Sequence, residues 1–496
     1  MNTIANARFL RLTLLTGLLA GCALPALAQT AYVNAKGEQH ASPVTATALI
    51  GGEVTTLETG WYLCNGSINY TGTITISGDV NLILGDGCDM RVTGSKDNAG
   101  INVTGSNSLT ITASANSSGK RLLIAHAGVE SNGAGIGGGR ERENGGVITI
   151  NGGTIIATGG YGVGALGPGI GGGPRSNGGA ITINNGMVIA TSGDGYGAKG
   201  TGIGCGYEGS DGTITINGGT VHAISGINSP RFGGGAGIGG CYGNGSTITI
   251  HGGTVDARGG SSRGPGIGGG GTVTVRGGTV NAAGGIGGEA GIVASVVNIY
   301  GGTVNANGGS SEAGISGGTI TIHGGTINAA GGNGGAGIGG SGAVFGNTGS
   351  NAGTIIIATS SKVLAKGGEA NSWNGLGAGA AIGQGGYRNG ESGAGIRPIP
   401  KLADTAVVAG GNAAFRVNVK TTGKPAPKLA YQWQQSTDGG ENWSSLTGAT
   451  RAILKMSGVT ARMNGYLYRC VVTVTGIGEK SSITYTTDSA RLTVRQ

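Results

Sequence analysis

One short repeat fills most of this chain and limits what the chain can fold into. Copies of it read GTITINGGTVHA at 212–223, STITIHGGTVDA at 246–257, GTVTVRGGTVNA at 271–282 and GTITIHGGTINA at 318–329. Successive Gly-Gly-Thr turns lie 33 or 34 residues apart in the early copies and 23 to 25 residues apart in the later ones. Such a period predicts a solenoid, because no single repeat can bury its own apolar face.

The repeat length and the residue alternation favour a parallel β-helix. A unit of 23 residues has room for three short strands and three turns, which is one turn, or rung, of that fold. Apolar and polar residues alternate in Ile248-Thr249-Ile250, as they do in a strand with one buried face. Glycine provides 115 of the 496 residues, and periodic glycine supplies turn conformations. A second apolar column is expected at Ile136, Ile170, Ile203, Ile238, Ile267, Ile292, Ile315 and Ile338.

The N-terminus has the features of a bacterial secretion signal. Basic residues precede an apolar run from Leu12 to Leu24, and Ala26-Leu27-Ala28 is a typical cleavage site. We therefore expect residues 1–28 to be removed and the protein to be secreted or held at the cell surface. The alternative is a lipoprotein, because Leu19-Ala20-Gly21-Cys22 is similar to a lipobox, in which Cys22 would carry the lipid. No other segment predicts a membrane span.

The repeat fades near residue 395, and the composition becomes ordinary. We expect an N-terminal segment at 29–50, a β-helix at 51–395, a stiff linker at 396–405 and an immunoglobulin-like β-sandwich at 406–496. Trp433 and Cys470, with Tyr468 two residues before the cysteine, match the strand-C tryptophan and the tyrosine corner of that fold. Ala413 and Phe415 stand where the partner cysteine would be, so the predicted sandwich lacks its disulfide. The predicted fold class is all-β.

Four cysteines have spacings that suit bridges between neighbouring rungs. Cys64 and Cys88 lie about one rung apart, and Cys205 and Cys241 follow the Gly-Ile segments of successive rungs. Disulfides would form in an oxidising compartment. Buried free thiols are the alternative for both pairs.

These motifs together resemble a group of bacterial secreted or surface proteins that carry GIGG and TITINGGTV repeats and a C-terminal Ig-like domain. Such proteins are often labelled carbohydrate-binding-domain-containing. The opening Gly60-Trp61-Tyr62-Leu63, followed by the strand-like 72–76 and 81–84, also resembles that group. The resemblance covers residues 55–395 and the C-terminal module. It implies the fold and an extracellular location, and it supplies no catalytic motif.

The long early rungs are the best candidates for a binding surface. About ten residues more than the shortest rung must leave the solenoid as loops, and function concentrates in loops on rigid scaffolds. These loops carry much of the scarce arginine and aromatic content, and stacking and charge-assisted hydrogen bonds would suit a glycan. We expect ligand contacts at Arg140, Arg175, Tyr207 and Tyr242. A second loop series contains Tyr161, Tyr196, Lys199, Arg231 and Phe232.

Outward-facing columns are the second candidate. One column is expected to contain Asn151, Asn184, Asn217, His251, Arg276, Tyr300 and His323, and another His222, Asp256, Asn281, Asn305 and Asn328. Each of the two columns is either a polar groove for sugars or a solvated face with an asparagine ladder.

The predicted function is therefore that of an adhesin or glycan-binding protein whose partner is an extracellular glycan or a cell-surface ligand. The alternative is a polysaccharide lyase or glycoside hydrolase, which needs paired carboxylates, and Glu208, Asp211 and Asp194 are its only marked candidates. The net charge of +8 is thinly spread, so nucleic-acid binding is not expected. No cofactor or metal site is expected either.

Overall fold

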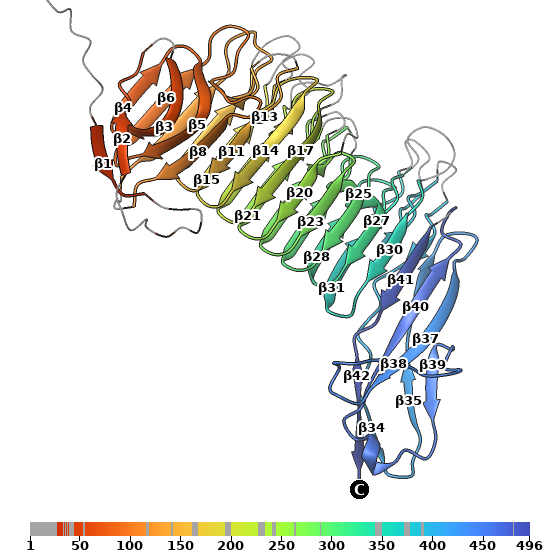
Figure 1. Ribbon diagram of the computed structural model, residues 1–496. Coiled ribbons are helices and arrows are strands. Elements are labelled where there is room, and N and C mark those ends of the chain that lie inside the picture. Colours follow the sequence, from red (N-terminus) through yellow and green to blue (C-terminus); the bar gives the residue numbers. More distant parts are fainter. Residues whose placement is uncertain are drawn as a thin grey trace, which may run out of the picture.

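The computed structural model shows an elongated all-β molecule, in which a stack of parallel rungs leads into a C-terminal β domain (Figure 1). It describes residues 27–32, 34, 36, 38, 44–52, 55–115, 119–139, 142–160, 167–193, 200–226, 234–240, 245–261, 264–287, 289–342, 350–371, 377–387, 391–479 and 481–496.

Each rung contributes strands to two parallel sheets. Short strands that begin at the isoleucine of the Gly-Ile column are β7 (Ile101–Asn102), β10 (Ile136–Gly137), β13 (Ile170–Gly172), β16 (Ile203–Cys205), β19 (Ile238–Gly239), β22 (Ile267–Gly268), β29 (Ile338–Gly339) and β32 (Ile382–Gly383). The T-I-T-I strands are β8 (Ser108–Ala113), β11 (Val147–Ile150), β14 (Asn177–Ile183), β17 (Ser210–Ile216), β20 (Thr247–Ile250), β23 (Thr272–Val275) and β30 (Thr354–Ile357). In β5 (Ile74–Leu84), β25 (Ile292–Ile299) and β27 (Ile315–Ile322) the two kinds of strand are continuous.

The G-G-T-V strands form the second sheet, which has 11 strands. They are β4 (Ser67–Tyr70), β6 (Cys88–Thr93), β9 (Arg121–His126), β12 (Thr154–Thr158), β15 (Met187–Thr191), β18 (Thr220–Ile224), β21 (Thr254–Arg258), β24 (Thr279–Ala283), β26 (Thr303–Asn307), β28 (Gly325–Ala330) and β31 (Ser361–Lys366). Apart from β4 and β31 at the two ends of the sheet, each strand pairs in parallel with the strands of the rungs before and after it, as the sequence predicts for a β-helix.

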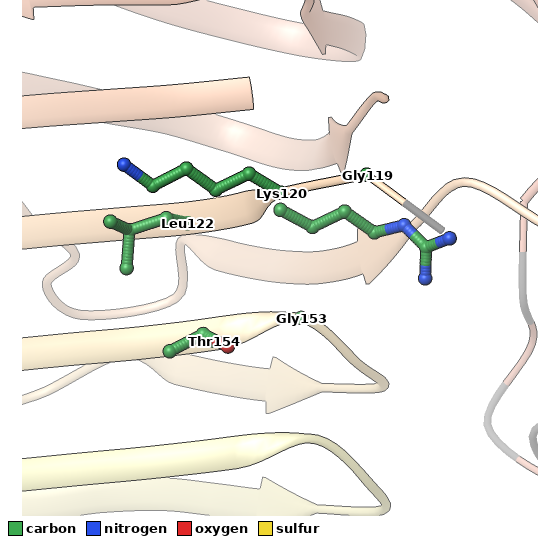
Figure 2. Close-up of a pocket in the computed structure, with 6 residues that line it drawn as sticks. Gly119, Lys120, Leu122, Gly153 and Thr154 are labelled. Carbon is green, nitrogen blue, oxygen red and sulfur yellow. The ribbon is translucent and has the colours of Figure 1, made fainter. Parts of the chain in front are cut away.

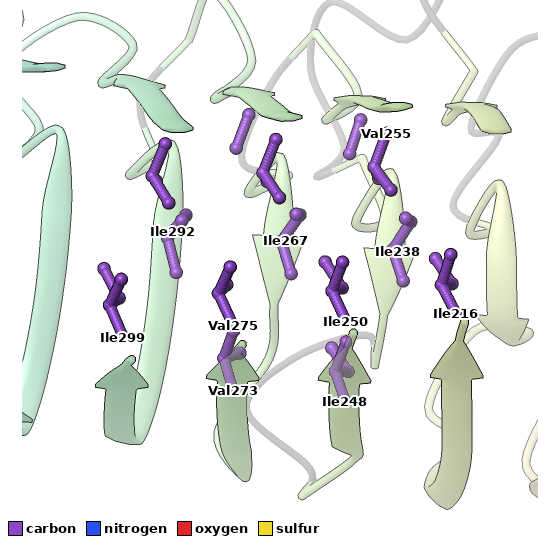
Figure 3. Packing of buried hydrophobic residues seen from close by; sticks show 14 of the residues in the cluster. Ile216, Ile238, Ile248, Ile250, Val255, Ile267, Val273, Val275, Ile292 and Ile299 are labelled. Atoms are coloured by element: carbon purple, nitrogen blue, oxygen red, sulfur yellow. The ribbon is translucent and has the colours of Figure 1, made fainter. Parts of the chain in front are cut away.

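The interior consists of aliphatic columns that run through the rungs in register. Ile238 pairs with Ile267, and Ile267 with Ile292, so equal side chains stack on one another. Figure 3 shows these three isoleucines in one row, facing the row formed by Ile250, Val275 and Ile299. All eight isoleucines of the predicted Gly-Ile column are fully buried. The predicted inward and outward faces of the repeat are therefore confirmed.

Glycine is needed in this fold mainly because the rungs approach one another closely. Gly204 has a φ of +141°, and a Cβ atom placed on it would lie 1.9 Å from the carbonyl oxygen of Gly239 in the next rung. The same conflict recurs at Gly171 and Gly239. A side chain at these positions would push two rungs apart, so the glycine of the Gly-Ile-Gly segment is a requirement of stacking.

The first rungs are closed by an N-terminal hairpin and a disulfide. Strand β1 (Leu27–Thr30) pairs antiparallel with β2 (Val44–Ala48), which pairs in parallel with β3 (Thr55–Cys64). The predicted signal cleavage after Ala28 lies inside β1 and stays a prediction. Cys64 and Cys88 form a disulfide with Cα atoms 5.6 Å apart, which confirms that predicted bridge. Cys205 is buried, but Cys241 lies outside the described residues, so the second pair stays a prediction.

The C-terminal domain is built mainly from antiparallel strand pairs. Its elements are β33 (Gly395–Ile396), β34 (Thr405–Val408), β35 (Ala413–Arg416), β36 (Thr421–Thr422), β37 (Lys428–Ser436), β38 (Ser444–Ser445), β39 (Ile453–Met456), the short 3-10 helix η1 (Ala461–Met463), β40 (Leu467–Thr475), β41 (Ser482–Thr486) and β42 (Ala490–Arg495). Strand β37 pairs with β38 and β40, and β35 pairs with β39. Strand β40 pairs with β41 and β42, and β34 runs parallel to β42.

The core of this domain contains the aromatic residues that the sequence marked. Trp433 faces Cys470 across the β37–β40 pair, and both are fully buried. The ring of Phe415 lies 4.9 Å from that of Tyr468. The Tyr468 hydroxyl is buried without a hydrogen-bond partner among the described residues, so the hydrogen bond of a tyrosine corner is not formed there. Burial raises the pKa of Tyr468 and that of the Cys470 thiol to about 12.

The C-terminal domain continues the solenoid by direct strand pairing. Strand β41 pairs in parallel with β30, from Thr354 with Ser482 to Ile357 with Tyr485. Strand β33 joins the last short strand, β32, to β36 of the domain. Ile399, within the predicted linker, is buried. Within the described residues, no helix is long and apolar enough to span a membrane.

Candidate functional site

The loops that follow the Gly-Ile-Gly strands form a continuous strip along the early rungs. The backbone N–H of Arg142 donates to the carbonyl of Pro174 at 2.7 Å, and the N–H of Arg175 donates to that of Tyr207 at 2.8 Å. Arg142, Arg175 and Glu208 occupy equivalent places, with φ values of +66°, +53° and +53°. Rung-to-rung hydrogen bonding thus extends beyond the strands into the loops, and their backbone is held in register.

Charges on this strip are partly neutralised. The Arg175 Nε atom lies 2.8 Å from Oε2 of Glu208, and the two side chains are 48% and 45% exposed. Glu143 accepts hydrogen bonds from the backbone N–H of Gly139 and from the Asn102 amide. Glu143 therefore braces its loop, and Arg175 and Glu208 together present one donor fork and one carboxylate to solvent.

The structure places only part of the predicted loop site. Arg175 and Tyr207 lie side by side on the strip, and Tyr207 is half-buried. Arg140 and Tyr242 lie outside the described residues, as does the second loop series at Tyr161, Tyr196, Lys199, Arg231 and Phe232. The enzyme candidate Asp194 also lies outside them, and the side chain of Asp211 is not described.

The first outward column changes character along the solenoid. In the early rungs it is an amide ladder, in which Asn217 donates to Asn184 at 2.6 Å and Asn184 donates to Asn151 at 2.7 Å. In the later rungs it becomes a stack of one guanidinium and two exposed rings. The Arg276 guanidinium lies 4.9 Å from the centre of the Tyr300 ring. The rings of Tyr300 and His323 stack at 4.4 Å with an interplanar angle of 4°.

This stacking limits what the later part of the column can bind. A sugar that binds to an aromatic residue needs an open ring face. One face of Tyr300 is covered by Arg276 and the other by His323. Neighbouring rungs are only about one strand spacing apart, so side chains in one column are in contact and leave no room for a sugar between them. The column is therefore poorly suited to stack a sugar on Tyr300.

The second outward column is a hydrogen-bonded polar ladder. His222 Nδ1 lies 3.1 Å from Oδ2 of Asp256. Asn281 donates to the other oxygen of Asp256, Asn305 donates to Asn281 at 2.7 Å, and Asn328 donates to Asn305 at 2.6 Å. The asparagine ladder considered from the sequence is thus present in both columns.

A hollow of about 450 Å³ lies at the turn before β9 and β12. In Figure 2, Lys120 extends along its strand above Leu122, and Gly153 and Thr154 lie on the next rung. The Lys120 ammonium is 2.6 Å from Asp89, which also pairs with Arg91. These two cations hold the pKa of Asp89 below its usual range. Because Lys120 is already paired, the hollow is a weak candidate for an anion site.

Within the described residues, no group of three histidine, cysteine or acidic side chains is arranged to hold a metal ion.

Comparison with known families supports the solenoid. A family model described as a β-helix repeat matches residues 148–174, 181–207, 214–244, 248–271, 297–319 and 320–342. The first match begins in β11, includes β12 and ends just after β13, which is one rung of the structure. The chain therefore contains β-helix repeats. A second model, for a domain of unknown function (DUF8696), matches residues 401–496.

No curated protein matches the sequence. Among solved structures, the chain is similar to one titled "Crystal structure of DIP-gamma IG1+IG2", with 18% identity and a TM-score of 0.14. The match covers 21% of this chain and 50% of that one, and so spans half the length of that protein. A likeness this low bears neither on the fold nor on the function of the chain.

Proposed function

We propose that this protein is exported and acts as a glycan-binding adhesin, with the loop strip of the early rungs as its binding surface. The strip comprises the described loops around Arg142, Arg175 and Glu208. The observation that carries the proposal is the hydrogen bonding between these loops, from Arg142 to Pro174 and from Arg175 to Tyr207. Such loops make a pre-ordered surface along the solenoid, which suits an extended chain because little ordering is needed on binding.

Export to an oxidising compartment is part of the proposal, and the Cys64–Cys88 disulfide supports it. The C-terminal domain would belong to the immunoglobulin-like class, and the pairing of β37 with β40 and of β35 with β39 supports that assignment.

A glycan array with the full mature chain tests the proposal. Arg142→Ala combined with Arg175→Ala should lower binding by about tenfold or more, because hydrogen bonds to charged groups contribute ~1.5–3 kcal/mol each. Lys362→Ala, an exposed substitution on β31 of the other sheet, should leave binding unchanged. Unchanged binding by the double variant would contradict the assignment of the strip.

The same preparation separates binding from catalysis. Reducing-sugar and unsaturated-product assays on the glycans that bind should show no turnover. Turnover that is lost in Glu208→Gln would instead favour a polysaccharide-active enzyme. Removal of the ten extra residues from each early rung should abolish binding while the far-ultraviolet spectrum of the solenoid is retained.

A further inference from the structure

The outer face of the second sheet carries a hollow that lies apart from the loop strip. Its volume is about 260 Å³, and its lining includes His222, Asp256, Arg258, Asn281 and Asn307. These residues come from four successive rungs, on β18, β21, β24 and β26. The hollow is smaller than the ~300 Å³ of the smallest pockets for drug-sized ligands, so its size suits a single sugar unit.

The hollow lies where a small residue, Ala283, stands between two longer ones in an outward column. Strand register places Ile224, Arg258, Ala283 and Asn307 in one outward column. Ala283 is half-buried, whereas Arg258 and Asn307 on either side of it are exposed. The methyl group of Ala283 therefore forms the floor, Arg258 and Asn307 form two walls, and Ile224 extends the apolar surface beyond Arg258.

The neighbouring column supplies hydrogen-bonding groups on a third side. Asp256 and Arg258 lie two residues apart on the same face of β21, so their Cα atoms are roughly 7 Å apart. Both oxygens of Asp256 are already engaged, by His222 and by Asn281. The carboxylate is thus held within its own column. In contrast, the Arg258 guanidinium forms no hydrogen bond or ion pair with any described residue, and it borders the hollow.

We propose that this hollow binds a carboxylate-bearing sugar, such as a uronic acid unit. The Arg258 fork would bind the carboxylate in a bidentate manner. The C–H face of the ring would lie over Ala283, and the amides of Asn281 and Asn307 would bind hydroxyl groups. The site lies on the second sheet and does not depend on the loop strip, so either proposal can fail without the other.

The test measures binding of sodium glucuronate to the full mature chain by ligand-observed NMR at low salt, with glucose and acetate as comparison probes. Glucuronate should bind more tightly than either, because glucose lacks the carboxylate and acetate lacks the ring and hydroxyls. Arg258→Met should weaken glucuronate binding by about tenfold or more, as expected for loss of a charge-assisted pair. A higher salt concentration should also weaken glucuronate binding to the parent chain, because salt screens the charge pair.

A size change in the floor gives an independent test. Ala283→Leu should fill the hollow and abolish binding. Ala330→Leu is the matched control, because Ala330 lies in the same outward column between Asn307 and Lys366, and it should bind glucuronate like the parent. Comparison of a tri-uronate probe with glucuronate then distinguishes the two possible sources of the bound uronic acid unit, a polysaccharide and a free sugar.

Three results would overturn the proposal. One is the absence of glucuronate binding to the parent chain. A second is equal binding of glucose or acetate. The third is loss of glucuronate binding in Arg142→Ala/Arg175→Ala with full retention in Ala283→Leu, which would place the acidic sugar on the loop strip.

Discussion

At the scale of single residues, the position of a side chain on the inner or outer face decides its effect on stability. Ile238 is fully buried between Ile203 and Ile267 of the neighbouring rungs. Ile238→Asp should destabilise the fold by several kcal/mol, because the carboxylate would be buried without a partner. Thr249→Ser, on the outer face of β20, should change stability little. Urea unfolding followed by circular dichroism measures both, and equal midpoints would show that the faces are assigned wrongly.

Glycine positions differ just as sharply in how much space they leave for a side chain. Gly204→Ala would bring a Cβ atom within 1.9 Å of a carbonyl oxygen of the next rung, whereas a Cβ atom at Gly105, which has a φ of +64°, would have no neighbour within 4 Å. Gly105→Ala should therefore cost only the ~1–2 kcal/mol of the left-handed conformation. Gly204→Ala should cost clearly more, since two rungs must separate. Comparable losses for the two variants in thermal unfolding would refute the stacking explanation.

At the scale of elements, the disulfide joins the end of β3 to the start of β6 across one rung. It closes a loop with a sequence separation of 24 residues, for which chain-entropy estimates give roughly 3 kcal/mol. Cys64→Ser combined with Cys88→Ser should lower the free energy of unfolding by about that amount. The double variant is preferable to a reductant, because a reductant would act on every cysteine. An unchanged unfolding midpoint in urea would mean that the bridge adds no stability.

The repeat allows the rungs, the inward columns and the proximity of Cys64 to Cys88 to be predicted from the sequence. In a solenoid, a residue and its counterpart one period later lie in contact, so periodicity in sequence becomes proximity in space. The Gly-Ile column follows from that rule. The rule also brings Cys64 next to Cys88, but it does not decide between a disulfide and two buried thiols. The asparagine ladders follow as well, because identical amides at rung spacing can hydrogen-bond to one another.

Side-chain arrangements within the columns could not be predicted in the same way. The occlusion of Tyr300 depends on which side chains flank it and on how their planes stack. The hollow over Ala283 depends on register across four rungs of unequal length. The position of Arg258 could nevertheless be predicted, because Arg258 lies two residues after Asp256 in a strand and must point from the same face of the sheet. The pairing of β30 with β41 left only a weak signal. Ser482-Ile483-Thr484-Tyr485 has the alternation of a T-I-T-I strand, but no Gly-Gly-Thr turn follows it.

At the scale of the whole molecule, a parallel β-helix has two open ends where strands lack partners. Such edges are templates for association with other chains. Here the C-terminal domain covers one end, because β41 adds to β30 and β36 adds to β33. Ile355 and Ile357 of the last T-I-T-I strand and Ile483 and Tyr485 of β41 belong to one buried cluster. The core therefore runs without a break from the solenoid into the domain.

A chain that ends at residue 400 should consequently lose its solubility as a monomer. The truncation removes β41 and β36, and it exposes the backbone edge of β30 together with the apolar side chains of the last rung. We expect concentration-dependent association of the truncated chain, measured by size-exclusion chromatography with light scattering, while the full chain remains a single species. Ile483→Lys in the full chain should produce a weaker form of the same effect, because it disturbs the joint while leaving the domain in place. A truncated chain that stays monomeric and melts at the temperature of the full chain would show that the solenoid does not need the domain as its cap.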